Sequence, residues 1–223
     1  MLKKDIVIGM GEIGLPIFKL LSKNMLVDGL DKIEKLNSEK FIDIKKIELM
    51  HICIPFTKSF QKSVIQLSKK YNPDGIIIHS TISPNTTKKL QNKLDLPIIY
   101  SATRGVHKRM LKDLKRYTKF FAVYDYAPNS KWASRTFKNK MKKCGVKTKQ
   151  MSQPITLELA KVVCDTSYYG WLINFAQISK IIADKENVDY DEMWSFTDEI
   201  QKFLKNRPKM FPGFIGGHCV IPN

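Results

Sequence analysis

Short apolar runs alternate with amphipathic stretches over the first two thirds of this chain. Six runs rich in Ile, Val, Leu and Phe have the length and composition of buried strands, and a more polar seventh strand is expected after them. These predicted strands span 5–10, 25–31, 47–55, 74–81, 96–102, 119–125 and 145–151. Helical periodicity marks the intervals 11–24, 32–38, 58–71, 84–94 and 128–143. Continuous apolar strands that alternate with helices predict a doubly wound α/β fold of the Rossmann type, with a mostly parallel sheet covered on both faces.

The pattern changes after the last predicted strand. A long helix is expected over 152–187, and it is unusually apolar over 168–182. A helix that is apolar on most sides is normally buried, here against the preceding region or against a second copy of the chain. A shorter helical segment over 188–206 and a loop rich in Pro and Gly follow. We therefore predict two regions, 1–151 and 152–223, the second formed by the long helix and a small helical region.

The charge balance is strongly basic. There are 38 Lys and Arg residues against 21 Asp and Glu residues, which gives a formal net charge of +17. Such a balance fits a solvated basic surface, an anionic small-molecule substrate or a nucleic-acid partner. The lysines are spread along the chain, apart from the stretch FKNKMKKCGVKTK at 137–149. This spread favours the basic surface and the anionic ligand over nucleic acid.

The cysteines and the N-terminal stretch indicate the compartment. The four cysteines form no C-x-x-C pair and no His spacing resembles a zinc site, so no metal is expected. Asp5 and Glu12 interrupt the N-terminal apolar stretch, which argues against a signal peptide. No apolar run approaches the length that crosses a membrane. We therefore expect a cytoplasmic protein with reduced thiols.

A glycine motif lies directly between the first predicted strand and the first predicted helix. It reads Gly9-x-Gly11-x-x-Gly14, and Asp31 ends the second predicted strand 22 residues after Gly9. In a dinucleotide site the first glycine allows a tight turn, the second admits a pyrophosphate and the third packs the helix on the strand. Asp31 can accept hydrogen bonds from a ribose diol, which favours NAD over NADP, although Lys32 softens that preference. A glycine turn without a ligand is the competing interpretation.

Hydroxyl groups follow the fourth predicted strand. Ser80 and Thr81 lie at its carboxyl end, where an open parallel sheet faces its ligand crevice, so a hydroxyl there can reach a nicotinamide or a substrate. Alternatively, Thr81 or Ser83 caps the next helix, with Pro84 in its first turn. Both interpretations stay open, and they are compatible.

Lys161 lies early in the long predicted helix, between Glu158 at i−3 and Asp165 at i+4. The simpler interpretation is a ladder of ion pairs on the helix surface. The functional interpretation is a lysine that turns into the crevice and stabilises a developing oxyanion.

Cys219 lies in a Gly-rich loop beside His218, where glycines permit close approach to a ligand. A neighbouring histidine can assist thiolate formation, which would make Cys219 a nucleophile. The alternative is a small core residue, the role that we expect for Cys53, Cys144 and Cys164.

Taken together, these motifs resemble the UDP-glucose/GDP-mannose dehydrogenase family of NAD-dependent nucleotide-sugar 6-dehydrogenases. The segments that carry the resemblance include IGMGEIGLPIFKLL, VDGLDKIEKLN, HICIPFT, HSTISPNTTKKL and FPGFIGGHC. The most specific are the GxGxxGLP start and the PGF-x-GGHC end. The resemblance covers the whole chain, but it corresponds only to the family's N-terminal NAD-binding domain and central helical region.

The resemblance implies a reaction and a set of residue roles. In the family, NAD oxidises the sugar's primary alcohol to an aldehyde, a cysteine captures the aldehyde, and a second NAD oxidises the adduct to a thioester that water releases as an acid. By resemblance, Cys219 is the nucleophile, Lys161 stabilises oxyanions and Thr81 is the active-site threonine. The implied cofactor-binding residues are Gly9, Gly11, Glu12, Ile13, Gly14, Asp31, Lys32, Pro55 and Thr81. The implied partner is a second copy, joined through the 152–187 helix.

The chain departs from the family pattern at several positions. Thr103 occupies the position of a glutamate that directs the hydrolytic water, Asp165 that of a catalytic asparagine, and Asn223 that of an aspartate after the cysteine. The C-terminal nucleotide-sugar-binding domain has no counterpart in the sequence. We therefore expect a minimal dehydrogenase acting on an anionic substrate, with a separate chain for the substrate domain as one possibility. The alternatives are a dehydrogenase of a smaller hydroxy acid and a catalytically impaired NAD-binding module.

Overall fold

The computed structural model describes residues 3–38 and 46–215. The chain divides into two compact units, Met1–Lys161 and Val162–Asn223. Cys219 and Asn223 lie outside the described residues.

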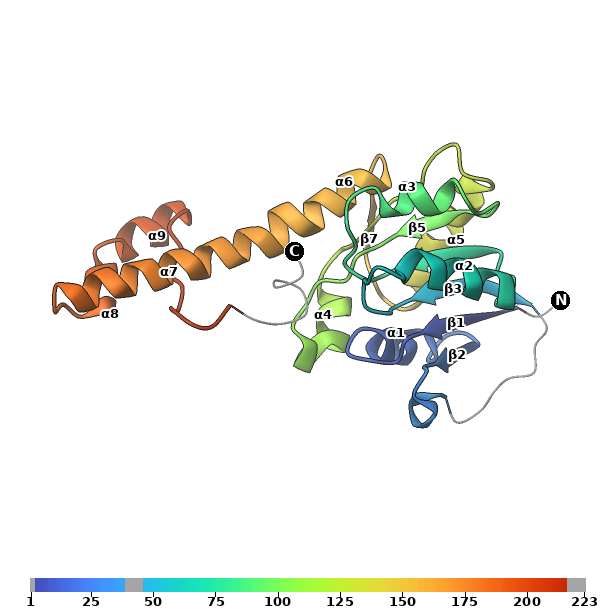
Figure 1. Ribbon diagram of the computed structural model, residues 1–223, viewed down its shortest axis with the longest axis horizontal. Helices are drawn as coiled ribbons and strands as arrows, with labels where there is room; N and C mark the ends of the chain where they lie inside the picture. The colour runs from blue at the N-terminus through green and yellow to red at the C-terminus, as the bar shows by residue number, and fades with distance from the viewer. Residues whose placement is uncertain (1–2, 39–45, 216–223) are drawn as a thin grey trace. The chain divides into compact units, whose positions relative to one another are not determined.

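A five-stranded sheet forms the centre of the first unit, and all of its ladders are parallel (Figure 1). Its order is β2-β1-β3-β4-β5. The strands are β1 (Lys4–Ile8), β2 (Val27–Leu30), β3 (Ile47–Ile52), β4 (Gly75–Ile78) and β5 (Ile98–Tyr100). This order confirms the predicted doubly wound fold, in which the carboxyl ends of the strands meet at one edge of the sheet.

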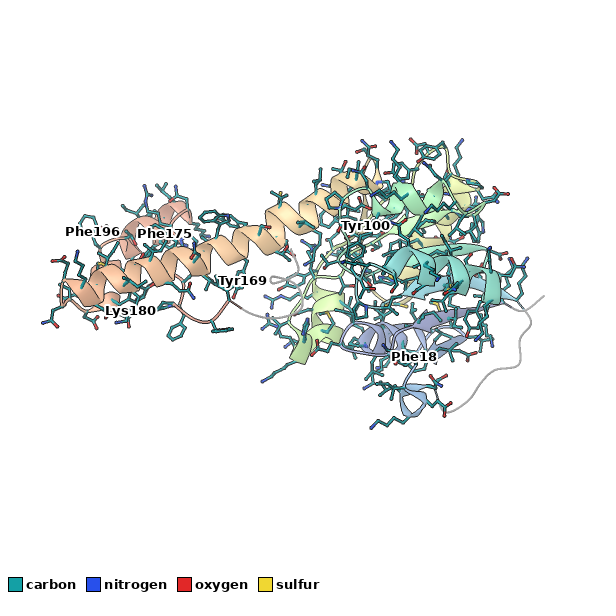
Figure 2. The ribbon with its side chains drawn as sticks, in the orientation of Figure 1. Phe18, Tyr100, Tyr169, Phe175, Lys180 and Phe196 are labelled. Atoms are coloured by element: carbon teal, nitrogen blue, oxygen red, sulfur yellow. The ribbon has the colours of Figure 1, made fainter. Side chains whose placement is uncertain are left out.

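Both faces of the sheet are covered by helices. On one face the sheet residues Val7, Leu49 and Ile77 pack with α1 (Gly14–Leu21), α4 (Met110–Arg116) and α5 (Ser130–Lys143). The opposite face, which includes the fully buried Tyr100 labelled in Figure 2, packs with three other helices. These are α2 (Phe60–Tyr71), α3 (Thr86–Gln91) and α6 (Pro154–Leu159). Continuous apolar strands are therefore required, because successive side chains enter two different cores.

The sixth and seventh predicted strands form a separate two-stranded sheet. Strands β6 (Lys119–Phe121) and β7 (Thr148–Gln150) pair in parallel. An antiparallel bridge between Tyr100 and Ala122 connects β6 to the edge of the main sheet. The carboxyl end of β6 therefore lies at the edge opposite to the carboxyl ends of β1 to β5.

Two local predictions differ from the structure. The helix expected over 32–38 is only a three-residue 3₁₀ turn, η1 (Glu34–Leu36). Helix α4, which follows the 3₁₀ turn η2 (His107–Arg109), was not predicted. Its few apolar residues, Met110, Leu111 and Leu114, lie among basic residues and mark a helical face only weakly.

Helical residues continue without a break through α6, the π-helical segment η3 (Ala160–Ser167) and α7 (Tyr168–Lys185). This confirms the predicted long helix, with ends that differ by two residues. In place of one segment over 188–206, the structure has α8 (Tyr190–Ser195) and α9 (Asp198–Leu204).

Helix α7 forms the centre of the second unit. Its Phe175 ring meets the Trp194 ring edge-on, with 6.2 Å between centroids, and Gln177 Nε2 donates to the Gly213 carbonyl at 2.6 Å. Other apolar side chains of α7 are exposed, including Trp171 at 69% and Ile181 at 67%. Tyr169 and Phe175, labelled in Figure 2, are also more than half exposed. No helix in the described ranges is long and apolar enough to cross a membrane.

Candidate cofactor site

The glycine loop leaves β1 in a conformation that only glycine adopts easily. Gly9 has a φ of +90°, and its N–H donates to the Leu30 carbonyl at 2.8 Å. A Cβ at Gly9 would lie 2.9 Å from the Cys53 carbonyl oxygen, so β3 also restricts this position. The strained φ and the close backbone explain why the chain turns here on glycine.

The other two glycines differ sharply in their surroundings. A Cβ at Gly14 would lie 1.6 Å from the Gly9 carbonyl oxygen, a distance that no side chain can occupy. A Cβ at Gly11 would meet nothing within 4 Å. Gly14 therefore permits the close approach of α1 to the loop, whereas Gly11 leaves open space above the backbone. In a dinucleotide-binding loop the second glycine admits the pyrophosphate and the third permits close packing of the helix on the strand. The surroundings of Gly11 and Gly14 fit these two roles.

The amino end of α1 follows this open space. The helix has no side-chain cap and no acidic residue in its first turn. Pro16 has no N–H and the Leu15 N–H donates to the Gly11 carbonyl at 3.0 Å, so the helix dipole is what favours negative charge at this end. The residues present therefore fit a pyrophosphate-bearing cofactor.

Asp31 is held directly against the glycine loop. Its Oδ2 accepts from the Met10 N–H at 2.7 Å, its Oδ1 accepts from the Ile33 N–H at 3.0 Å, and its own N–H donates to Asn37 Oδ1 at 2.7 Å. The first two bonds fix the carboxylate at the carboxyl end of β2, and the third fixes the Asp31 backbone. The carboxylate lies where the ribose acid of a dinucleotide site is expected, and each oxygen retains a lone pair for a hydroxyl.

The remaining predicted cofactor residues occupy the same sheet edge. Ile13 is half-buried in the loop, whereas Lys32 and Pro55 are exposed after β2 and β3. Glu12 Oε2 lies 2.8 Å from His107 Nδ1, which ties the loop to the turn before α4. The sequence interpretation did not identify His107.

Thr81 is half-buried after β4, and the Ser80 hydroxyl donates to the Ile54 carbonyl at 2.6 Å. The capping interpretation for Thr81 and Ser83 is wrong, because α3 begins at Thr86 without a capping side chain from its own segment. Instead, the Glu158 carboxylate of α6 accepts from the Asn85 N–H at 2.5 Å and the Thr87 N–H at 2.9 Å.

The same contacts change the interpretation of Lys161. Glu158 is fully buried and engaged with α3, so it cannot form a surface ladder of ion pairs. Lys161 is itself 7% exposed and lies in η3, whereas Asp165 is exposed. The Glu158 part of the expected surface ladder is therefore wrong, whereas the pairing of Lys161 with Asp165 stays a prediction.

The expectation for the other cysteines holds only in part. Cys144 is buried and Cys53 is half-buried, but Cys164 is exposed. Across residues 3–38 and 46–215, no group of three or more His, Cys, Asp and Glu side chains could hold a metal ion.

A buried lysine that the sequence interpretation missed lies at the end of β5. Lys119 of β6 is 6% exposed, and its Nζ donates to the Ser101 carbonyl at 3.1 Å and to Thr103 Oγ1 at 3.3 Å. Burial lowers the pKa of Lys119 to about 7, and the charge of Arg104 adds to this effect. The Lys119 amine therefore changes between its charged and neutral forms near neutral pH. The Lys119 amine thus contacts Thr103, the residue that by resemblance replaces the glutamate of the nucleotide-sugar dehydrogenases.

A row of polar side chains crosses the buried face of the sheet from β1 to β4. His51 Nε2 lies 3.3 Å from Asp5 Oδ2, and His51 Nδ1 lies 2.9 Å from His79 Nε2. Lys140 of α5 donates to Asp5 Oδ1 at 2.9 Å. Burial opposes ionisation of Asp5, but His51 and Lys140 outweigh it and lower the carboxyl pKa. Burial, together with the charge of Lys119, lowers the pKa of His79 well below its ordinary value, so His79 is neutral at neutral pH.

Comparison with known proteins supports the fold. The sequence matches no protein-family model and no curated protein. The structure is similar to the UDP-N-acetyl-mannosamine dehydrogenase of Staphylococcus aureus, with a TM-score of 0.75 and 18% identity over 97% of this chain and 63% of that one. It is also similar to the GDP-mannose dehydrogenase of Pseudomonas aeruginosa, with a TM-score of 0.68 and 15% identity over 96% of this chain and 60% of that one.

A third similar structure is the 3-hydroxyisobutyrate dehydrogenase of Mycobacterium tuberculosis, with a TM-score of 0.68 and 16% identity over 93% of this chain and 72% of that one. The chain thus spans about 60% of the length of the two sugar dehydrogenases. At these identities the likeness concerns the fold. This chain therefore has the fold of the NAD-binding and central helical regions of nucleotide-sugar and hydroxyacid dehydrogenases.

Proposed function

We propose that this chain is an NAD-dependent oxidoreductase that acts on the primary alcohol of a nucleotide sugar or a similar anionic substrate. The observation that carries the proposal is the contrast between Gly14, which has no room for a side chain, and Gly11, which faces open space just before the amino end of α1. We assign cofactor binding to residues 1–151 and part of the reacting set to 152–223.

NAD supplies the hydride acceptor when it is bound. Of the chain's own residues, Thr81 at the carboxyl end of β4 orients the substrate, and Lys161 stabilises negative charge on the reacting oxygen. Cys219 adds to the aldehyde carbonyl as a thiolate, in accordance with the family resemblance. By the same resemblance, Asp165 contributes a carboxylate to the reaction where the family has an amide.

A net charge of +17 supports an anionic substrate. The structural likeness to two dehydrogenases whose names specify UDP- and GDP-linked sugars supports the same class. A second chain that carries the substrate domain would supply the remaining contacts to the nucleotide.

We further propose that α7 pairs with α7 of a second copy. Its exposed apolar side chains form a stripe too large for an ordinary solvated surface, namely Tyr168, Trp171, Phe175, Ile178, Ile181 and Ile182. Burial of such a stripe is the usual basis of an obligate homodimer.

Oxidation of a smaller hydroxy acid is the second candidate. It is favoured by the likeness to 3-hydroxyisobutyrate dehydrogenase, of which this chain spans a larger share than of the sugar dehydrogenases.

The test is NADH formation from NAD with a panel of UDP-, GDP- and TDP-sugars, compared between wild type, Cys219→Ser and Lys161→Ala. We expect turnover with one sugar, a loss of about 100-fold or more in Lys161→Ala, and a loss of acid product in Cys219→Ser with NAD binding intact. Turnover that survives Cys219→Ser in full but disappears in Lys161→Ala would instead support the hydroxy-acid reaction. No NADH from any sugar, in protein that binds NAD, would contradict the proposal for the chain acting alone.

A further inference from the structure

A cavity lies beside α5. It has a volume of about 360 Å³, which is within the usual range for small-molecule sites. Its lining comes from α5 and from the segments at the ends of β6 and β7, all within the first unit. The lining residues are Val123, Asp125, Ser130, Lys131, Ser134, Arg135, Lys138, Asn139 and Gln150.

The position of the cavity separates it from the glycine loop. Strand β6 is antiparallel to β5, so Val123 and Asp125 lie at the sheet edge opposite to the carboxyl ends of β1 to β5. A ligand in this cavity would therefore be distinct from the cofactor.

Three basic side chains of α5 line this cavity. Lys131, Arg135 and Lys138 are spaced i, i+4 and i+7, which places them on one face of the helix. In the part of the chain that the structure describes, none of the three has a carboxylate within ion-pair distance. Asp125 is the one acidic residue in the lining. Like charges at this spacing repel one another, and a bound anion relieves that repulsion.

Neutral donors are fixed next to these cations. Ser134 is 9% exposed, and its Oγ accepts from Gln150 Nε2 at 3.3 Å, which leaves the hydroxyl proton available to a ligand. Ser130 Oγ donates to the Asp125 carbonyl at 3.1 Å. Helix α5 has 14 residues, no side-chain cap and no acidic residue in its first turn, so its amino end adds to the positive potential.

We propose that the α5 cavity binds a small phosphorylated molecule that carries at least two negative charges. Flexible cations provide the attraction, and the Ser134–Gln150 pair and the amino end of α5 provide directed hydrogen bonds to phosphate oxygens. Diphosphates are the class that suits cations spaced along two turns of one helix.

The test is a titration of ¹⁵N-labelled protein with inorganic pyrophosphate at constant ionic strength, followed by amide chemical shifts. The test variant is the double substitution Lys131→Ala with Arg135→Ala. A matched control removes two exposed lysines of α2, Lys62→Ala with Lys69→Ala, and so lowers the net charge equally. Equal midpoints of urea unfolding verify that both variants fold.

We expect saturable shifts at residues 130–139 and at Gln150, and a pyrophosphate affinity at least about tenfold weaker in the test variant than in the control. Equal weakening in both variants would overturn the proposal, since it would indicate attraction by net charge alone. Shifts confined to residues 9–14, or no saturable shift, would also overturn it.

Discussion

The Gly14→Ala variant is expected to lose about 3 kcal/mol or more of its free energy of unfolding, or to fail to fold. The new Cβ would lie 1.6 Å from the Gly9 carbonyl oxygen, which is backbone and cannot rotate away. Relief requires α1 to move off β1, and this motion would also disturb Ile17, Leu20 and Leu21 in the core. Urea unfolding followed by circular dichroism measures the loss.

Gly11→Ala is the matched control for this substitution. It adds the same methyl group three residues earlier, where nothing lies within 4 Å. We expect its free energy of unfolding to stay within about 0.5 kcal/mol of wild type. If Gly14→Ala were as stable as Gly11→Ala, the close packing of α1 on the loop would be contradicted.

Replacement of Lys119 by methionine is expected to stabilise the protein by about 3 kcal/mol at pH 7. Burial lowers the lysine pKa from 10.5 to about 7, which means that the fold disfavours the charged amine by about 5 kcal/mol relative to the unfolded chain. The variant loses the two hydrogen bonds to Ser101 and Thr103, which offsets about 2 kcal/mol of this gain. Methionine has a similar length and flexibility, so it fits the space with little strain.

The stability difference between Lys119→Met and wild type is expected to depend on pH. Between pH 7 and pH 10.5 the unfolded state holds a proton on Lys119 that the folded state has lost, so wild-type stability rises with pH through this window. The advantage of Lys119→Met is therefore full below pH 7 and falls as the pH rises through this window. Near pH 10.5 only the loss of the two hydrogen bonds remains, so the variant is expected to be about 2 kcal/mol less stable than wild type there. Lys112→Met, an exposed position on α4, is the control and should match wild type at each pH. A destabilised Lys119→Met at pH 7, or a gain that does not depend on pH, would contradict the assignment of a buried amine.

The central layer of the fold was predictable because its signals are local. Each of the five sheet strands is a short apolar run, and the glycine motif lies between the first strand and its helix. A buried parallel strand needs apolar residues on both faces, so hydropathy alone marks it. The positions of Gly9, Gly11 and Gly14 then follow from the chemistry of the turn.

The buried polar groups were not predictable in the same way. Asp5 and His51 belong to β1 and β3 and His79 directly follows β4, and nothing in their local sequence shows that they meet in one hydrogen-bonded row. Lys119 begins an apolar run and has the appearance of an exposed strand terminus. Its burial depends on contacts with Ser101 and Thr103 of a neighbouring strand end. Glu158 likewise caps α3 from far along the chain, which no local capping rule anticipates.

The most direct test of the account is a calorimetric titration of NAD into wild type and Gly11→Val, with NADP titrated in parallel. A Cβ at Gly11 meets open space in the free protein, and we expect a valine there to occupy the space that a pyrophosphate needs. We predict that wild type binds NAD more tightly than NADP because of Asp31, and that Gly11→Val keeps wild-type stability while its NAD affinity falls on the order of 100-fold. Absence of NAD binding in wild type, or equal NAD affinity in the two proteins, would contradict the assignment of this loop as a dinucleotide site.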